Sequence, residues 1–377
     1  MLDFDAFLSH LHFQDLIRPG DYDSLQLARS IKALRTGSID LDAADIILLG
    51  CGERRGGQGT EVYSDAPNVI REAFYALYNW YPNIAIADLG NIVEGASISD
   101  TKAALRIILE ELHKAGKIVI LLGGAQDLTL QQYEAFKQEQ ETIDAAVIDS
   151  LIDLEDEEAL SDRSFLMDML TSHPNYIRNY SHIGFQSYYV NPRMLETLDK
   201  LRFDFYRLGT VRSDMEEMEP VLRNCSLLSV DVNALRKSDA PFLPDASPNG
   251  FFGDELCQLM RYAGMSNKMC SIGIYGYNPE DDEERQGAKL IAQMLWYFID
   301  GYRIRLSEAA PAQNDQFLVY NVPFAEYDTV FVKSRITGRW WMQLPDQSYM
   351  PCSQKDYETA AQQEIPERWM REQERLL

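Results

Sequence analysis

The chain of 377 residues is 46% hydrophobic and 11% aromatic, which is enough to bury a large core and excludes a mainly disordered protein. Its net charge of −24 argues against nucleic acids and anionic membranes as partners, and no run approaches the ~18 apolar residues of a membrane span. The acidic start lacks the basic region of a signal peptide, and the five cysteines show no CxxC spacing. We therefore expect a cytoplasmic protein.

The predicted elements begin with an N-terminal segment, residues 1–43, in which two helical stretches flank the turn-forming sequence RPGDYDS. Eight apolar, strand-like runs follow, at residues 45–51, 84–90, 117–123, 144–150, 181–187, 204–210, 226–232 and 269–275. Amphipathic helical segments lie between them; one, at 67–80, starts with Pro67, and another ends at Gly116. This alternation predicts a three-layer α-β-α domain over residues 44–305, with a central, mostly parallel eight-stranded sheet.

The C-terminal segment, residues 306–377, has a different pattern. Two β-like runs, FLVYNV and TVFVKS, precede RITGRWWMQLP with its Thr-Gly turn, and a charged helical pattern ends the chain. We expect a compact, β-containing extension. Its tryptophan pair, Trp340 and Trp341, suits either a partner surface or, more commonly, packing of the extension against its own domain.

Polar residues lie at or just after the ends of three of the predicted strands. If the predicted strands end near residues 122, 149, 231 and 275, the residues after them meet at one edge of the sheet. They are Gln126, Asp127, Asp149, Asp153, Asp231 and Asn233. In an extended chain Asp149, Leu151 and Asp153 point the same way. Carboxylates gathered at one edge repel each other unless they are protonated or hold a cation. The pattern therefore indicates a metal site, while acids that cap helices or are simply solvated remain the alternative.

These segments resemble a known family. LLGGAQDLTL (121–130), VIDSLIDLED (147–156) and SVDVNALRKSDAP (229–241) resemble the Gly-Gly-x-His-Asp, Asp-Ala-His-x-Asp and Ser-x-Asp-x-Asp-Ala-x-Asp-Pro motifs of the ureohydrolases, the arginase, agmatinase and formimidoylglutamase group. Segments 52–72 and 274–293 resemble two further family segments, in the same order. The resemblance implies an arginase-like fold with an eight-stranded parallel sheet. It also implies hydrolysis of a guanidine or amidine carbon by a hydroxide that two Mn²⁺ ions activate.

The expected ligand set is altered in this sequence. Carried over by position, the first ion would be bound by Gln126 (His in the family), Asp149, Asp153 and Asp231. The second ion would be bound by Asp149, Leu151 (His in the family), Asp231 and Asn233 (Asp in the family). Gly276 stands where many family members have a glutamate that orients the substrate. Because leucine cannot coordinate a metal, a dinuclear manganese centre is not expected. The remaining oxygen ligands suit at most one weakly bound cation, Mg²⁺, Ca²⁺ or Mn²⁺.

We interpret the chain as a ureohydrolase-fold protein with a substituted metal site: a non-catalytic ligand-binding or scaffolding relative. Two alternatives remain, a metal-dependent C–N hydrolase of linear amidines or guanidines and an enzyme of altered chemistry in the same cleft. The expected ligand is a small amidine or amino-acid-like molecule, and the resemblance implies a homo-oligomer. The residues expected to contact the ligand are Gln126 and Asn233, together with Arg54 and Arg55 unless these two are solvated surface arginines.

Other chemistries find less support. Cys51 has no neighbouring histidine motif that would make it a nucleophile, so a buried thiol is expected. The glycine-rich loop after it lacks the Gly-Lys-Ser/Thr ending of a phosphate-binding loop. His10 and His12 are two residues apart and do not share a helix face, which argues against a metal role.

Overall fold

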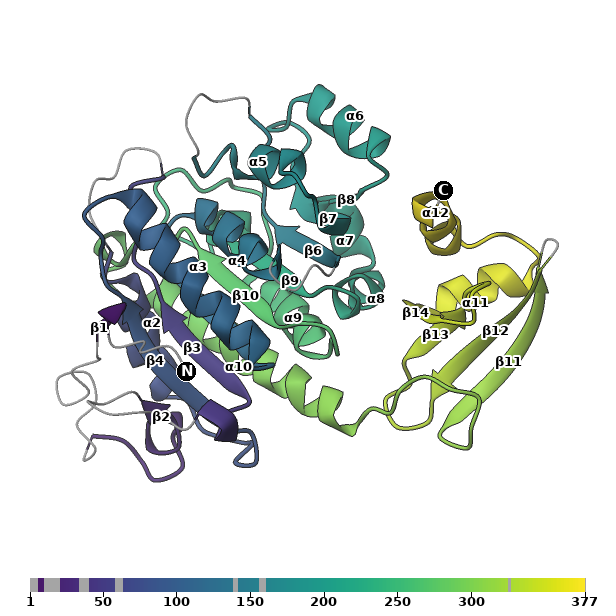
Figure 1. Cartoon of the computed structure of the whole chain (residues 1–377), viewed down its shortest axis with the longest axis horizontal. Helices are drawn as coiled ribbons and strands as arrows, with labels where there is room; N and C mark the ends of the chain where they lie inside the picture. Colours follow the sequence, from purple (N-terminus) through teal and green to yellow (C-terminus); the bar gives the residue numbers. More distant parts are fainter. Residues whose placement is uncertain are drawn as a thin grey trace.

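A computed structural model of the protein describes residues 6–9, 21–33, 41–57, 64–137, 142–155, 161–324 and 327–376. It contains an α/β domain and a C-terminal module at one side of it (Figure 1). The central sheet has the strand order β1-β4-β3-β5-β10-β9-β6-β7-β8, and β2 also pairs with β4. Its strands are β1 (Leu8–Ser9), β2 (Lys32–Ala33), β3 (Ile46–Gly50), β4 (Ile86–Ile92), β5 (Ile118–Leu122), β6 (Ile143–Ile148), β7 (Ile177–Phe185), β8 (Asp204–Arg207), β9 (Leu227–Asp231) and β10 (Ser271–Tyr275).

The eight predicted strands are β3 to β10, and all of their pairings with one another are parallel. The sheet is larger than expected because β1 and β2, two residues each, pair with β4. The prediction of helices in residues 1–43 is wrong for the described parts, which form these strands and the short 3-10 turns Leu27–Arg29 and Leu41–Ala43. His10 and His12 lie outside the described residues.

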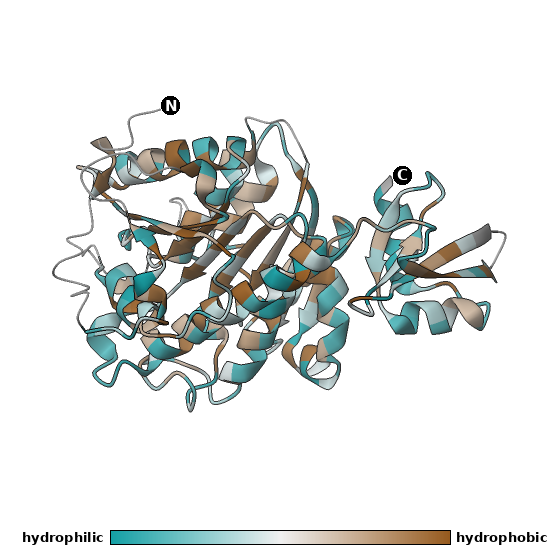
Figure 2. Ribbon diagram, turned by 90° about the horizontal axis from the view of Figure 1, so that it is seen from below, coloured by the Kyte–Doolittle hydropathy of each residue, from teal (hydrophilic) through white to brown (hydrophobic). Residues whose placement is uncertain are grey.

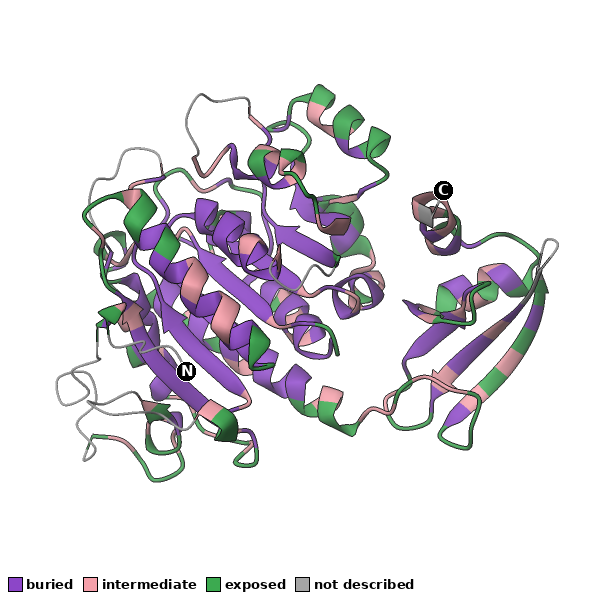
Figure 3. Ribbon diagram, in the orientation of Figure 1, coloured by how far each residue is buried: buried purple, intermediate pink, exposed green. Residues whose placement is uncertain are grey.

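Helices cover both faces of the sheet, as predicted. One face carries α3 (Ile98–Lys114), α4 (Thr129–Phe136), α5 (Phe165–Thr171) and α6 (Pro192–Lys200). The other carries α2 (Ala66–Tyr75), α7 (Leu208–Ser213), α8 (Met218–Arg223), α9 (Gly253–Gly264) and α10 (Gln286–Ser307). The side chains of β3 alternate between the two faces of the sheet. Ile46 and Leu48 pack on the face that α2 and α10 cover, and Ile47 and Leu49 pack on the face that α3 covers. Figures 2 and 3 show these strands as hydrophobic and buried.

Local signals explain where the helices begin and end. Ser97 and Asp100 form a capping box at the start of α3, and Gly116, with φ +67°, follows its end. The other predicted helix, α2, stops at Tyr75 instead of continuing to residue 80.

Within the part of the chain that the structure describes, none of the helices combines the length and apolar character that a membrane span requires. All five cysteines are thiols, and Cys51 is fully buried.

The C-terminal module contains a second, antiparallel sheet. Its strands are β11 (Phe317–Phe324), β12 (Tyr327–Ser334), β13 (Trp340–Gln343) and β14 (Tyr349–Cys352), followed by α11 (Gln354–Ala361) and α12 (Glu367–Leu376). Trp340 and Trp341 are 7% and 4% exposed, so they pack inside the protein and do not form a partner surface. Trp340 stacks on Tyr357 of α11.

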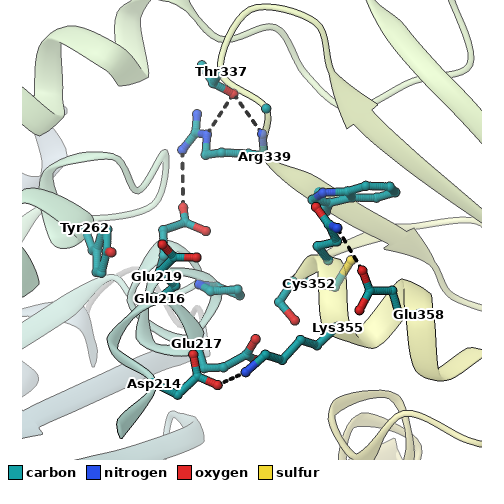
Figure 4. Close-up of a pocket in the computed structure, with 15 residues that line it drawn as sticks. Asp214, Glu216, Glu217, Glu219, Tyr262, Thr337, Arg339, Cys352, Lys355 and Glu358 are labelled. Carbon is teal, nitrogen blue, oxygen red and sulfur yellow. Dashed lines mark hydrogen bonds and ion pairs between the residues drawn. The ribbon is translucent and has the colours of Figure 1, made fainter. Parts of the chain in front are cut away.

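An open pocket of about 530 Å³ lies between the module and the α/β domain (Figure 4). Acidic residues from the segment before and within α8 face Arg339 and Lys355 of the module there, and Lys355 forms an ion pair with Asp214. Ion pairs between these acids and the basic side chains of the module join the module to the domain. This pocket shares no lining residue with the edge of the central sheet where the predicted site residues lie.

Candidate site at the carboxyl edge of the central sheet

Three of four neighbouring strands carry the candidate residues at their ends. β5, β10, β9 and β6 are adjacent and parallel, so their carboxyl ends lie at one edge of the sheet. Asp231 is the last residue of β9, Asp149 directly follows β6, and Gln126 begins the 3-10 turn Gln126–Leu128 that connects β5 to α4. This topology is the reason why residues separated by about a hundred positions meet.

The structure brings Gln126, Asp149, Asp153 and Asp231 together in the interior. They are 2%, 2%, 4% and 7% exposed, respectively. The side-chain amide of Gln126 lies 3.1 Å from Asp149 Oδ2 and 3.2 Å from Asp153 Oδ2. The Asp231 carboxylate is close enough to interact electrostatically with the other two. The side chains thus form one acidic cluster around an uncharged amide, and we call these four residues the strand-end cluster.

Burial changes the acidity of this cluster. Desolvation raises the pKa of Asp149 to about 7, although the backbone N–H groups of Leu151 and Ser150 partly stabilise its charge. Desolvation also raises the pKa of Asp153 and of Asp231 well above the usual value, and the charge of Asp149 raises both further. Negative charge is therefore costly here without a compensating proton or cation.

The backbone after β6 differs from the expectation. Asp149 Oδ1 accepts hydrogen bonds from the N–H groups of Ser150 and Leu151, so the chain bends and is not extended from 149 to 151. Leu151 is partly exposed and, with Asp153, lines a cavity of about 660 Å³. Arg163 and Arg193 line the same cavity, together with Met167 and Met194 among other apolar side chains.

One acid near the cluster was missed in the sequence. Asp162 raises the pKa of both Asp153 and Asp231 through its charge. The N–H of Asp162 donates to the carbonyl of Gly56, which joins its loop to the loop after β3. Asp162 follows no predicted strand, so its place in the sequence does not indicate that it lies near the cluster.

The remaining predicted residues have separate places. Asp127 is fully buried and paired with Lys102, and a Cβ added at Gly56 would lie 2.0 Å from Asp127 Oδ2. Asp127 therefore supports the loop after β3 and lies outside the cluster. Arg55 donates to the buried carboxylate of Glu53 at 2.9 Å.

Arg54, Asn233 and Gly276 lie at the same edge of the sheet. Arg54 Nη1 donates to Asn278 Oδ1 at 2.9 Å. Asn233 is exposed, and its backbone N–H donates to Asp231 Oδ1 at 2.7 Å. Gly276 has φ +80°, and a Cβ added there would lie 2.5 Å from Asp231 Oδ1. A glutamate at this position would meet both backbone strain and a close contact.

The positions where the family resemblance implies ligands for two manganese ions hold a different set of residues here. Leu151 supplies no donor atom, and His182 bonds through Nδ1 to the Tyr180 hydroxyl and through Nε2 to the backbone carbonyl of Asp149. Among the described residues, no three His, Cys, Asp or Glu side chains are arranged as a metal-binding group. The donors that do face one another are oxygens: carboxylate Oδ2 atoms of Asp149 and Asp153, and the carbonyl of Gln126 when it is turned toward them. Such a set suits one hard cation.

Comparison with known proteins agrees with this fold. Formimidoylglutamase from Staphylococcus aureus is 20% identical over 245 residues, which cover 62% of this chain and 78% of that protein. The structure of formimidoylglutamase from Bacillus subtilis matches with a TM-score of 0.65 at 18% identity, covering 74% of this chain and 92% of that one. Trypanosoma cruzi formiminoglutamase with Mn²⁺ matches with a TM-score of 0.66 at 16% identity, covering 74% and 99%. The model of the Arginase family matches residues 44–300, and the chain therefore belongs to the arginase family.

Proposed function

We propose that this arginase-family protein binds one hard divalent cation and a small polar ligand at the strand-end cluster, and that it does not hydrolyse amidines with two manganese ions. The observation that carries the proposal is the position of Leu151. This side chain lies beside Asp153 where the sequence pattern of the family places a nitrogen ligand, and it offers no donor to a second ion. Two metal ions must lie close together to activate a water molecule between them. Without the second ion, the hydroxide nucleophile does not form in this way.

The ligand follows from the chemistry of the 660 Å³ cavity that Leu151 and Asp153 line. Asp153, which lines it, favours a group that donates hydrogen bonds or carries positive charge, such as an amidine. Arg193 also lines this cavity and favours a carboxylate group on the same ligand. A small amidine or amino-acid-like molecule meets both requirements, and its binding without turnover would make the protein a sensor or scaffold. We also propose a homo-oligomer, which light scattering of the purified chain tests.

The decisive experiment counts metal ions and measures turnover on the same preparation. Protein grown in manganese-rich medium is expected to hold at most one ion per chain. It is expected to release no urea, ammonia or formamide from arginine, agmatine, guanidinobutyrate or formimidoylglutamate. Two ions per chain, or manganese-dependent turnover that EDTA abolishes, would overturn the proposal.

One observation favours a second candidate, a metal-dependent C–N hydrolase of linear amidines or guanidines. Asp149, Asp153 and Asp231 stand where the family's motifs have carboxylates, and they lie together in the interior. If formimidoylglutamate alone is hydrolysed, this candidate replaces the first. In that case the substrate itself, or a cation bound by the three acids, must compensate for the donor that Leu151 does not provide.

A further inference from the structure

Two adjacent tyrosines shortly after β7 combine high exposure with fixed side chains. Tyr188 and Tyr189 are 64% and 51% exposed, and their rings meet edge to face with centroids 4.6 Å apart. The hydroxyl of Tyr188 donates to Gln186 Oε1, and that of Tyr189 donates to Ser247 Oγ at 3.3 Å. Fixing two exposed side chains costs conformational entropy while burying little apolar surface. The arrangement therefore indicates that the rings serve a contact that the chain alone does not make.

Buried polar groups hold both tyrosines in place. Gln186 and Ser247 are 3% and 7% exposed, and Ser247 Oγ donates to Gln186 Oε1 at 3.2 Å. The side-chain amide of Gln186 also donates to the carbonyl of Asn249 at 3.0 Å, and its backbone N–H donates to the carbonyl of Ser150 at 2.9 Å. Ser150 belongs to the loop after β6, which carries two acids of the strand-end cluster. These hydrogen bonds therefore fix the tyrosine loop against the loop of the cluster.

Tyr189 lines the cavity of about 660 Å³ that Leu151 and Asp153 also line. The hydroxyl hydrogen of Tyr189 is already donated to Ser247, which lies outside the described lining of this cavity. The ring is therefore what this side chain offers to a ligand. The wall of the cavity combines a carboxyl group with an aromatic ring that is fixed in advance, so a ligand that contacts both loses little affinity to the ordering of the protein.

A carboxylate and an aromatic face attract the same kind of group. The face of an aromatic ring carries the negative part of its quadrupole and attracts cations. Among cations, planar groups of the guanidinium type are weakly hydrated and stack on aromatic faces, whereas a primary ammonium is compact and strongly hydrated. The N–H groups of such a planar cation lie in its plane, so it can face a ring and donate to a carboxylate at the same time.

We propose that Tyr189 determines the specificity of this cavity for a planar cation. Its ring covers one face of an amidinium or guanidinium group of the ligand, while Asp153 accepts hydrogen bonds from the edge of that group. Tyr188 supports the ring of Tyr189 from the side. This inference rests on the proposed binding of an amidine-like ligand and is independent of the proposed metal cation.

The test measures the binding of three matched amino acids to the full chain by calorimetry. Arginine carries a planar cation, citrulline carries an uncharged planar group of similar shape, and lysine carries a charge without the planar group. The wild type is expected to bind arginine at least about threefold more tightly than the other two. Tyr189→Leu is expected to weaken arginine binding by about three- to tenfold and to leave the affinities for citrulline and lysine nearly unchanged.

Two further variants separate the ring from the hydroxyl and from general effects. Tyr189→Phe keeps the ring and is expected to retain the selectivity for arginine. Tyr78→Leu is the matched control, because Tyr78 is 52% exposed and lies outside the described lining of the cavity. It is expected to leave all three affinities unchanged. Thermal unfolding of each variant shows that the fold is intact, as expected for substitutions of exposed side chains.

The outcomes distinguish this inference from the proposed function. A wild-type protein that binds arginine no more tightly than citrulline or lysine contradicts the selectivity for a planar cation. If Tyr189→Leu keeps the selectivity of the wild type, Tyr189 does not determine it, while the ligand cavity stands. If the wild type binds none of the three amino acids, this inference fails. If it also binds no formimidoylglutamate, the proposed ligand site fails with it.

Discussion

The guanidinium carbon of Arg223, at the end of α8, lies 4.3 Å from the centre of the Trp341 ring in β13. The same guanidinium donates to the backbone carbonyls of Trp340 at 2.9 Å and Cys352 at 3.3 Å. Arg223 is 4% exposed, and burial lowers its pKa to about 10. One side chain of the α/β domain thus bonds to the backbone of two strands of the C-terminal module and also stacks on the indole ring of Trp341.

Removing Arg223 should therefore weaken the junction strongly. Arg223→Leu leaves two backbone carbonyls without this donor and removes the nearer of two arginines that pair with Glu219, and we expect a loss of about 3 kcal/mol in unfolding free energy. Urea unfolding measures it. The control is Arg303→Leu, whose guanidinium lies 5.5 Å from the Tyr81 ring but whose side chain is 52% exposed. It should cost less than about 1 kcal/mol. Equal effects of the two substitutions would contradict the role of burial.

His113 should make the protein sensitive to mild acid. It is buried at the end of α3 against Phe136, and burial lowers its pKa to about 4 from the ordinary value of 6.5. The folded state therefore favours the neutral ring, so stability is full above pH 6.5 and falls as the pH decreases toward 4, by about 3 kcal/mol. His113→Leu should remove this part of the loss and leave stability at pH 8 equal or higher, as measured by thermal unfolding at both pH values. A variant with the unchanged pH profile would contradict the assignment.

Most of the eight parallel strands were predictable because they are continuous apolar runs between helices, as strands buried on both faces require. The exception is the edge strand β8, which has Asp204 and Arg207 at its ends and no buried residue. The meeting of Gln126, Asp149, Asp153 and Asp231 followed from their places after those strands. β1 and β2 were not predictable, because two residues carry no periodic pattern.

The contacts within the site could not be predicted from the sequence, for a different reason. The bend at Asp149 depends on a side-chain hydrogen bond to Leu151, and the approach of Asp162 depends on a contact with Gly56. Both arise from the way two loops pack, which no periodicity encodes. The pairing of Arg55 with Glu53 could not be predicted either, because the sequence of this loop does not show which group its arginine pairs with.

The C-terminal module should be required for the chain to remain soluble and unaggregated. Truncation after residue 305 removes the acceptors of Arg223 and uncovers strand β8, the edge of the central sheet, where Asp204 pairs with Arg375 of α12. An uncovered edge strand promotes association between chains. We expect lower soluble yield and aggregation in light scattering. The control is Arg371→Ala, whose guanidinium lies 3.7–3.9 Å from the carboxylates of Asp199, Asp204 and Glu367. A soluble truncated chain with unchanged assembly would show that the module is dispensable.

Gly276 should tolerate no side chain. With φ +80° and Asp231 Oδ1 2.5 Å from the place of a Cβ, Gly276→Ala combines backbone strain with a steric contact. We expect a loss of about 1–3 kcal/mol in unfolding free energy. Gly209→Ala in α7 is the matched control, because nothing lies within 4 Å of its added Cβ, and it should be neutral or slightly stabilising. Similar melting temperatures for the two variants would remove the argument that the backbone here excludes a glutamate.

Rebuilding the ligand set should restore metal binding more readily than activity. In the variant Gln126→His, Leu151→His, Asn233→Asp, two imidazoles and a fourth carboxylate surround the retained acids, and such ligands suit Mn²⁺. We expect more manganese per chain than in the parent, measured by elemental analysis, but no hydrolysis of agmatine or formimidoylglutamate. Turnover should stay absent because Gly276 cannot be replaced by glutamate without strain, and because Asn233 is exposed, so a carboxylate there must first turn inward. A variant that binds no more manganese than the parent would show that these positions do not correspond to the family's ligands. A variant that hydrolyses either substrate would show that the lost ligands alone silence the natural chain.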